Sequence, residues 1–343
     1  MLMNKKKLSL RLAAVLVSSM MMITSAHAAK KYKFTMQNMF SLNHPVTLAM
    51  TQLAADVKEK SDGRISIQVL PSGALVKGPS IFESVGMGSI DMGTSCSCYH
   101  GGMLPAAATA FALPGDPRGV DEIMDFIYKD EVNAFFKDAY ATQGVYYGAP
   151  LIMDGYTIVS KNPINTWEDL KKMKVRASGT IAKTLQKMEI PTVFIPFSEI
   201  YVALSRGTID AEISGNHAES YLAKTYEVAK YQTTPYISGA QNCEVIANQD
   251  RVNELPADLK VIFDQALKDS AVNMVEAFNA ENKSVMGKMT DSGAQFLALP
   301  DDVMQRWIKT AVQMWDEELT KDELSAEYIA LVKKDLKSRG YDL

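Results

Sequence analysis

Short stretches in which apolar and polar residues alternate mark candidate β-strands in the first hundred residues. Lys31–Met36 and Ile65–Leu70 alternate as half-buried strands do, and residues 46–60 between them place apolar side chains at helical spacing. Ser80–Met87 predicts a further helix, and Ile90–Thr94 begins another strand. Strands and helices that alternate on this scale predict parallel sheets covered by helices, which is an α/β fold.

A second series of the same kind follows Pro163. Its predicted elements are a helix at 166–170, a strand at 174–176, a helix at 180–188, a strand at 192–195, a helix at 198–205 and a strand at Ile209. Gly88–Asp91 and Gly207–Asp210 share one order, in which a helix-ending glycine precedes Ile-Asp at a strand start. Because the two glycines lie 119 positions apart, about one lobe, the repeat predicts two similar α/β lobes.

The last hundred residues carry a different, helical pattern. A long helix is predicted from Pro256 to about Met289, and two amphipathic helices at 302–319 and 324–337 follow it. No low-complexity linker separates the lobes, so the chain is expected to cross between them more than once, with the long helices bracing both. The predicted division is lobe I at 29–153 plus 243–281, and lobe II at 154–242 plus 282–343.

The first 28 residues have the pattern of a secretory signal peptide. Lys5–Lys7 and Arg11 precede the apolar stretch 12–24, and Ala26–Ala28 offers the small-x-small cleavage site. A membrane anchor is the alternative, but the apolar stretch is short and no stop-transfer pattern follows. Cleavage near Ala28 and a soluble periplasmic protein are therefore expected. No later stretch is long and apolar enough to span a bilayer, and Met103–Pro114, the nearest, contains a proline.

Composition and charge further limit the kind of protein that the chain can be and the partners that it can bind. The chain has 343 residues, of which 47% are apolar and 22% charged, as in ordinary globular proteins. Its formal charge is −4; residues 1–28 contain four basic residues and no acidic one, so the mature chain carries −8. A chain with this net negative charge has no overall positive potential to attract a phosphate backbone, so nucleic acid is not an expected partner.

Residues with the chemistry of catalysis are sparse. There is no nucleophile elbow, no phosphate-binding loop and no zinc-protease motif. The chain has three cysteines, so at least one stays free or pairs between chains. A disulfide between Cys96 and Cys98 is sterically unfavourable. Stability is therefore expected from the apolar core and not from disulfides. Cys96, Cys98 and His100 leave a soft-metal site or a secreted Cys/His hydrolase or oxidoreductase as alternatives. No catalytic residue, metal or cofactor is predicted.

Arg176 is the strongest candidate binding residue. It ends a predicted strand and precedes the start of a helix, which places its guanidinium at the mouth of the sheet beside free helical N–H groups. Both features attract an oxyanion. Ser178, just after it, adds a hydroxyl donor or caps its own helix. The alternative is a surface arginine paired with a nearby acid.

Two stretches of the chain have a distinctive pattern, residues 163–176 (PINTWEDLKKMKVR) and 196–211 (PFSEIYVALSRGTIDA). They occur together with His44-Pro45, Ser61–Arg64, Gly88–Asp91 and Ala229–Tyr231. In these residues the sequence resembles the DctP-type solute-binding proteins of tripartite ATP-independent periplasmic (TRAP) transporters. The resemblance implies a two-lobe venus-flytrap binding protein that hands an organic anion to the small and large membrane permease subunits. It does not imply an enzyme.

The resemblance also implies a set of ligand-binding residues. The family's carboxylate-clamping arginine falls on Arg176 and its pocket asparagine on Asn216, where the loop is about one residue longer than in the family. Phe197 is expected to wall the pocket, and the strand end that includes Ser95 and Cys96 to line the cleft. His44 and Ser178 complete the candidate set.

One departure from the family bears on the ligand. Some acid-binding relatives carry a second arginine before Pro163, where this chain has Met153–Tyr156. Without it a dianion loses a charge-assisted partner, worth about 1.5–3 kcal/mol per hydrogen bond. A small monoanion is therefore expected, either a sulfonate such as isethionate or taurine or a small hydroxy- or keto-carboxylate. C4-dicarboxylates remain an alternative within the family, and an adhesion or chaperone module is a third class.

Overall fold

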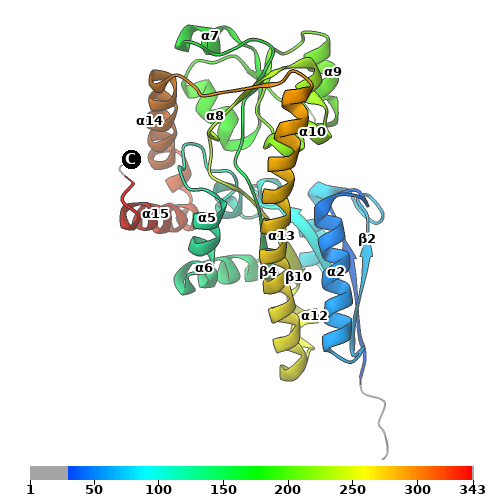
Figure 1. Cartoon of the computed structure of the whole chain (residues 1–343). Coiled ribbons are helices and arrows are strands. Elements are labelled where there is room, and N and C mark those ends of the chain that lie inside the picture. Colours follow the sequence, from blue (N-terminus) through cyan, green and yellow to red (C-terminus); the bar gives the residue numbers. More distant parts are fainter. Residues whose placement is uncertain (1–29, 196, 342–343) are drawn as a thin grey trace, which may run out of the picture.

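The computed structural model describes residues 30–195 and 197–341, which form two β-sheets surrounded by helices (Figure 1). The signal peptide predicted at residues 1–28 lies outside the described residues. The α/β character predicted from the alternation of strands and helices is confirmed, and each sheet lies in one of two lobes placed end to end.

The first sheet has the strand order β2-β1-β3-β10-β4. Its strands are β1 (Tyr32–Gln37), β2 (Ile65–Leu70), β3 (Met92–Cys96), β4 (Val145–Met153) and β10 (Gln241–Asn248). β1 runs parallel to β2 and β3, but β10 inserts antiparallel between β3 and β4. The prediction of purely parallel sheets is wrong here, because a strand from far along the chain returns in the opposite direction.

The second sheet has the order β11-β9-β5-β8-β6-β7. Its strands are β5 (Val159–Ser160), β6 (Val175–Arg176), β7 (Thr192–Val193), β8 (Ala211–Glu212), β9 (Tyr231–Thr233) and β11 (Gln295–Leu297). β6 is parallel to β7 and β8, whereas β5 is antiparallel to β8 and β9. This sheet is mixed for the same reason: β5 enters from the first lobe and β9 leads back to it.

The repeated Gly-x-Ile-Asp segment has the same structure in both lobes. Gly88 and Gly207 both adopt φ +73°, the left-handed conformation that ends a helix at low steric cost. Asp91 then accepts a hydrogen bond from the backbone N–H of Thr35 at 2.8 Å, and Asp210 accepts one from the N–H of Lys174 at 2.9 Å. In each lobe the aspartate therefore ties the start of one strand to the neighbouring parallel strand.

Most of the helices are confined to a single lobe, either the first or the second. Those of the first lobe are α2 (Pro45–Lys60), α3 (Ile81–Gly86), α4 (Pro105–Thr109), α5 (Val120–Ile127), α6 (Asp130–Ala141) and α12 (Gln249–Asn253). Those of the second lobe are α7 (Trp167–Lys172), α8 (Gly179–Lys187), α9 (Ile200–Ser205), α10 (His217–Leu222) and α11 (Thr225–Val228).

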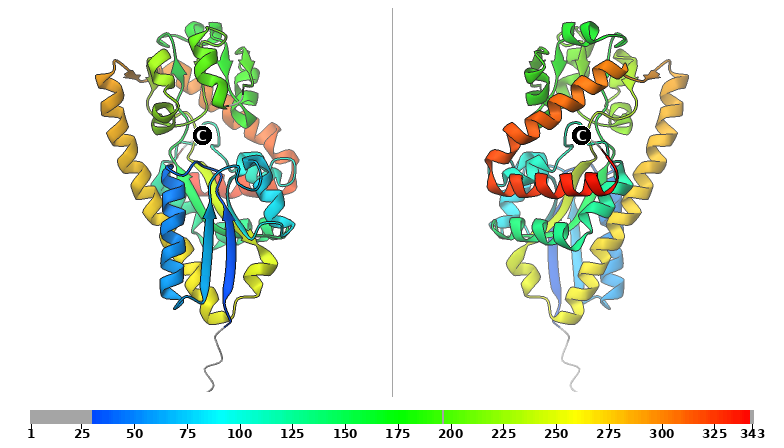
Figure 2. Two further views of the ribbon diagram at one scale, coloured as in Figure 1. Left: turned by 90° about the vertical axis from the view of Figure 1, so that its right-hand side faces the viewer. Right: turned by 90° about the vertical axis from the view of Figure 1, so that its left-hand side faces the viewer.

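Three helices form the C-terminal part of the chain, and the long helix α13 connects the lobes, as predicted. α13 (Ala257–Asp291) has 35 residues and so extends over about 50 Å. It packs against α2 and β4 at one end and against α10 at the other. α14 (Asp301–Glu317) contacts α8, and α15 (Glu323–Ser338) packs on α4 and α6 (Figure 2). The lobe boundaries stay a prediction, and this packing favours counting α15 with lobe I.

The chain crosses between the sheets at residues 154–158 and again at 234–240, besides its passage through α13 and α14. None of the described helices combines the length and apolar composition that crossing a membrane requires.

A buried ion cluster anchors α15 to the first lobe. Arg118, only 2% exposed, donates from Nη2 to Asp116 at 2.7 Å and from Nη1 to Asp335 on α15 at 2.9 Å. Its guanidinium also lies 4.4 Å from the ring centre of Phe126. Because these charged groups are shielded from water, removal of any one of them would leave its partner buried and unpaired, which destabilises the fold.

Candidate functional site

Arg176 lies at the end of β6, between the two lobes. Its side chain is buried, with the residue 6% exposed, and its Nε donates to the carbonyl of Ile195 at 2.9 Å. The guanidinium carbon lies 5.7 Å from the ring centre of Phe194. Within residues 30–195 and 197–341, no carboxylate oxygen comes within 4.0 Å of the guanidinium, and its two terminal nitrogens have no hydrogen-bond partner. Burial lowers the pKa of Arg176, and the neighbouring charge of Glu212 opposes that fall.

The charge of this guanidinium acts on three side chains that lie outside the second sheet. Cys98 and Tyr99 belong to the 3-10 turn Ser97–Tyr99 that follows β3, and Tyr156 lies in the first crossing segment. Tyr156 is buried, which raises its pKa, and the positive charge of Arg176 opposes that rise; the same charge also acts on Cys98 and Tyr99. The charge of Arg176 in lobe II therefore acts on the turn that follows β3 in lobe I.

Exposed apolar side chains follow β3 in the first lobe and β7 in the second. Tyr99 and Met103 of the first lobe are 50% and 43% exposed, and Phe194 and Phe197 of the second are 68% and 47% exposed. Large apolar side chains left in water near a buried charge are typical of a binding surface that becomes covered. Phe197 is exposed, and its expected place in the wall of the pocket stays a prediction.

Glu212 lies next to Arg176 in the second sheet. The two are register partners in the parallel strands β8 and β6, so their side chains project from the same face. Glu212 is 3% exposed, accepts from the hydroxyl of Thr225 at 3.1 Å and accepts a further bond from Ser214. Burial raises the pKa of Glu212. Those two hydroxyls, and not Arg176, supply its hydrogen bonds.

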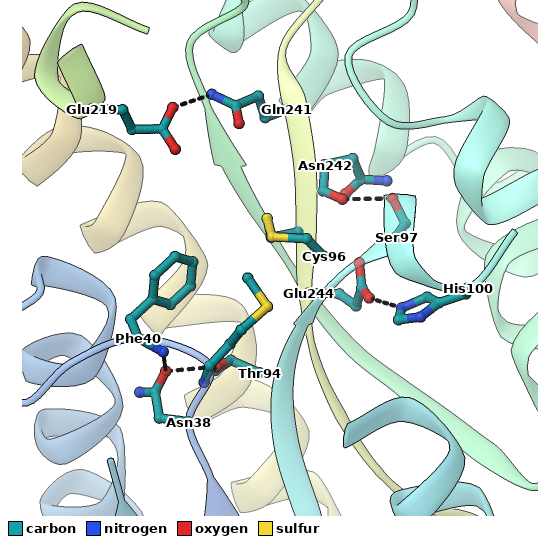
Figure 3. The surroundings of a disulfide bond; sticks show 12 residues. Asn38, Phe40, Thr94, Cys96, Ser97, His100, Glu219, Gln241, Asn242 and Glu244 are labelled. Atoms are coloured by element: carbon teal, nitrogen blue, oxygen red, sulfur yellow. Dashed lines mark hydrogen bonds and ion pairs between the residues drawn. A yellow bond between two sulfur atoms is a disulfide. The ribbon is translucent and has the colours of Figure 1, made fainter. Parts of the chain in front are cut away.

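Asn216, Glu219 and Gln241 form a linked group beside it. Asn216 caps α10: its Oδ1 accepts from the N–H of Glu219, and its own N–H donates to Oε2 of Glu219, both at 3.0 Å. The same Oε2 accepts from Nε2 of Gln241 in β10 at 2.7 Å, which joins α10 to the first sheet (Figure 3). The buried Nδ2 of Asn216 has no partner among the described residues.

The other predicted site residues lie in different surroundings. Ser178 is the N-cap of α8, half-buried, and its hydroxyl makes no capping bond, so it is free to donate. His44 is the N-cap of α2; its ring stacks 4.1 Å from that of Phe40, and burial lowers its pKa to about 4. Ser95 is fully buried opposite Glu244 in the first sheet, with no partner for its hydroxyl within the described chain.

The Cys96, Cys98 and His100 motif does not converge on one site. Cys96 forms a disulfide with Cys243, its register partner across β3 and β10, whereas Cys98 is free and exposed. His100 is buried, and its Nε2 lies 2.6 Å from Oε1 of Glu244 (Figure 3). The expectation of stability without a disulfide is wrong, because β10 brings a distant cysteine beside β3. No group of three His, Cys, Asp or Glu side chains in the described ranges is placed to hold a metal ion.

A separate cavity of about 450 Å³ lies among α5, α13 and the two crossing segments. Asp154 and Tyr236 line it, and Asp154 accepts hydrogen bonds from Tyr236 and Asn282. The cavity shares no lining residue with the surroundings of Arg176, so it is a distinct feature of the region between the lobes.

Several groups at the site were not predicted from the sequence. These are Tyr99, Tyr156, Glu212, Glu219 and Gln241. One local signal was present for Glu219, because Asn216-His-Ala-Glu219 has the spacing of a capping box. The others come together through the pairing of distant strands.

Comparison with known proteins agrees with this architecture. A family model described as bacterial extracellular solute-binding protein, family 7 (DctP) matches residues 36–322. A monocarboxylate 2-oxoacid-binding periplasmic protein of Nostoc sp. is 25% identical over 273 residues, covering 79% of this chain and 74% of its own. The C4-dicarboxylate-binding periplasmic protein DctP of Rhodobacter capsulatus is 23% identical over 277 residues, with coverages of 80% and 81%.

A solved structure is similar over most of its length. It is a TRAP periplasmic solute-binding protein from Colwellia psychrerythraea with bound calcium and pyruvate, which superposes with a TM-score of 0.80 at 26% identity. The alignment covers 89% of this chain and 94% of that one. The family match spans well over half of the sequence and confirms the resemblance inferred from it. The chain belongs to the DctP family, family 7 of the bacterial extracellular solute-binding proteins, which serve TRAP transporters.

Proposed function

We propose that this protein captures a small organic anion in the periplasm through Arg176 and delivers it to the membrane permease subunits of a TRAP transporter. The anion is a sulfonate such as isethionate or a small carboxylate. The observation that carries the proposal is a guanidinium that is buried between the lobes without an ion-pair partner in the described chain. A cation in such a place loses hydration, and a bound oxyanion supplies what it lacks.

The names of the relatives support an anionic ligand. The Nostoc protein is named for monocarboxylate 2-oxoacids, the Rhodobacter protein for C4-dicarboxylates, and the Colwellia structure contains pyruvate. All of these compounds are carboxylates, and a sulfonate presents a similar group of oxygens to a planar guanidinium. Ser178 and the Nδ2 of Asn216 are further donors for those oxygens.

Binding is proposed to work by closure of the lobes over the ligand. An oxyanion on Arg176 draws together the rims that carry Tyr99 and Phe197, and the aromatic side chains are then removed from water. Exclusion of water also strengthens the ion pair, because the effective dielectric constant falls. The ligand favours the closed form only by its stronger binding to that form, and no covalent bond changes.

Replacement of Arg176 by alanine tests the proposal. Calorimetric titration and ligand-induced thermal shifts would be measured with isethionate, taurine, pyruvate, lactate and succinate. Loss of two charge-assisted hydrogen bonds, each worth about 1.5–3 kcal/mol, predicts at least about 100-fold weaker binding of the anion that wild type prefers. The matched control is Arg206→Ala, which removes an exposed arginine of the same lobe.

The control variant is expected to bind like wild type, and both variants to keep the wild-type circular dichroism. Retention of the ligand-induced thermal shift by a folded Arg176→Ala variant would show that the arginine does not clamp the anion.

A further inference from the structure

Arg176 and Glu212 project from one face of the second sheet but are turned in different directions. They are register partners in the neighbouring parallel strands β6 and β8, whose backbones lie about 4.7–4.9 Å apart. β6 lies between β8 and β7, and Nε of Arg176 donates to the carbonyl of Ile195, just after β7. The guanidinium also faces the ring of Phe194 in the same segment. It is therefore directed toward β7 and away from the strand that carries Glu212.

Two hydroxyls occupy the carboxyl group of Glu212. Its Oε1 accepts from Oγ1 of Thr225 at 3.1 Å, and its Oε2 accepts from the hydroxyl of Ser214. Thr225 begins α11, and Ser214 lies between β8 and α10. Among the described residues, no ion pair within 4.0 Å joins the carboxyl to Arg176. Both carboxyl oxygens thus have partners other than the neighbouring guanidinium.

Further buried side chains fix the hydroxyl of Thr225. Oγ of Ser220 lies 2.9 Å from Oγ1 of Thr225 and accepts from Nε2 of Gln232 at 3.1 Å. Oε1 of Gln232 in turn lies 2.9 Å from Nδ1 of His217, and all of these residues, with Glu212, are 3% exposed or less. Because Thr225 gives its only hydroxyl proton to Glu212, Ser220 donates to Thr225. The bonds from Gln232 onward therefore all point toward the carboxyl, and such buried chains reinforce one another.

We propose that Ser214 and Thr225 are positioning residues of the binding site, which keep Glu212 from pairing with Arg176. A buried carboxyl without its hydroxyl donors would be left unsatisfied beside a guanidinium that has free N–H groups. An ion pair between the two would satisfy both, and it would favour the ionised carboxyl. The arginine would then be occupied by the protein itself. This inference rests on the proposed function, because it concerns the arginine that binds the anion.

Internal pairing lowers the affinity for the ligand in proportion to the arginine that it occupies. The apparent Kd is the intrinsic Kd divided by the fraction of molecules whose arginine is free. Pairing in about nine molecules of ten therefore weakens binding about 10-fold.

The variant Thr225→Val tests the restraint, since valine keeps nearly the same shape without the hydroxyl. Calorimetric titration with isethionate, taurine, pyruvate, lactate and succinate is expected to show about 10-fold or more weaker binding of the anion that wild type prefers. Ser214→Ala, at a half-buried position, is expected to act in the same direction. The matched control is Thr184→Val, which removes a buried hydroxyl bonded within α8 and is expected to stay within about 3-fold of wild type.

A rescue variant distinguishes the restraint from a general loss of structure. Glutamine cannot form an ion pair with a guanidinium, so Thr225→Val/Glu212→Gln is expected to bind within about 3-fold of Glu212→Gln alone. Damage to the fold by the loss of the hydroxyl would not be repaired by the second change.

A thermodynamic cycle on the unliganded protein tests the same point without any ligand. Urea unfolding would be measured for Arg176→Met, Glu212→Gln and the double variant, each with and without Thr225→Val, or with Ser214→Ala if the valine variants do not fold. The two changes are expected to depart from additivity by about 10-fold or more in the unfolding constant when the hydroxyl is absent, and by less than about 3-fold when it is present.

The outcomes separate this inference from the proposed function. Unchanged binding by Thr225→Val, no rescue by Glu212→Gln, or equal coupling with and without the hydroxyl overturns the restraint, even where Arg176→Ala abolishes binding. If Arg176→Ala binds the anion like wild type, the proposed function fails, whereas the unfolding cycle still decides whether the hydroxyls keep Glu212 from Arg176.

Discussion

The disulfide between Cys96 and Cys243 is expected to contribute substantially to stability. It joins β3 to β10 across a sequence separation of 147 residues, at register partners in the middle of the first sheet. The chain-entropy relation gives about 5 kcal/mol at 25 °C for a loop of that length, and removal of native disulfides costs about 2–5 kcal/mol in practice. We therefore expect Cys96→Ala/Cys243→Ala to lower the free energy of unfolding by about 2–5 kcal/mol.

Urea unfolding of the mature protein measures this loss, with Cys98→Ala as the control. Cys98 is free and exposed, so its removal is expected to leave the unfolding midpoint unchanged, and reductant is expected to shift wild type toward the double variant. Thiol titration in denaturant should find one reactive thiol before reduction and three after it. Three thiols before reduction, or a double variant within about 1 kcal/mol of wild type, would refute the reasoning.

The buried ion cluster on α15 gives two further expectations. Arg118→Met leaves two buried carboxylates without their shared cation and should cost about 3–5 kcal/mol in urea unfolding, whereas Asp116→Leu/Arg118→Met should recover much of that loss; equal instability of both variants would contradict this. Burial alone would raise the pKa of Asp335, but hydrogen bonds from Lys129, Arg118 and Arg339 outweigh it, so the folded pKa lies below the ordinary 3.8. That stabilisation is present above pH 3.8 and is lost as the pH falls through the folded value, so the urea midpoints of wild type and Asp335→Asn should differ most near neutral pH and converge in acid. A difference that is constant with pH would contradict the assignment.

Local sequence patterns identified much of the second lobe. The predicted helix at 180–188 and strand at 174–176 correspond to α8 and β6, and Arg176 stands where the strand-to-helix transition indicated. Likewise, the helix predicted from Pro256 to about Met289 is observed at Ala257–Asp291. Such elements are specified by apolar spacing, caps and glycines within a few residues, so they can be read without knowledge of distant contacts.

Residues 97–161 received no predicted element, although part of their structure has local signals. α5 and α6 each carry two acidic residues in the first turn and bury one face, which is typical of amphipathic helices. β4 is different: its last five residues are all buried, so it lacks the alternation that marks a half-buried strand. The missing strand is the edge strand that pairs with β10 in the first sheet.

By itself, the sequence determined many of the helices and strands, the repeated Gly-x-Ile-Asp segment, the family and the candidate arginine. Only the tertiary structure decided that β10 runs antiparallel beside β3, that Cys96 meets Cys243, and that Glu219 of α10 accepts a hydrogen bond from Gln241 of β10. The physical reason is the sequence separation between the residues that interact. Periodicity and capping act between neighbours in the chain, whereas strand pairing and the meeting of charges depend on contacts among segments more than a hundred residues apart, which no local pattern encodes.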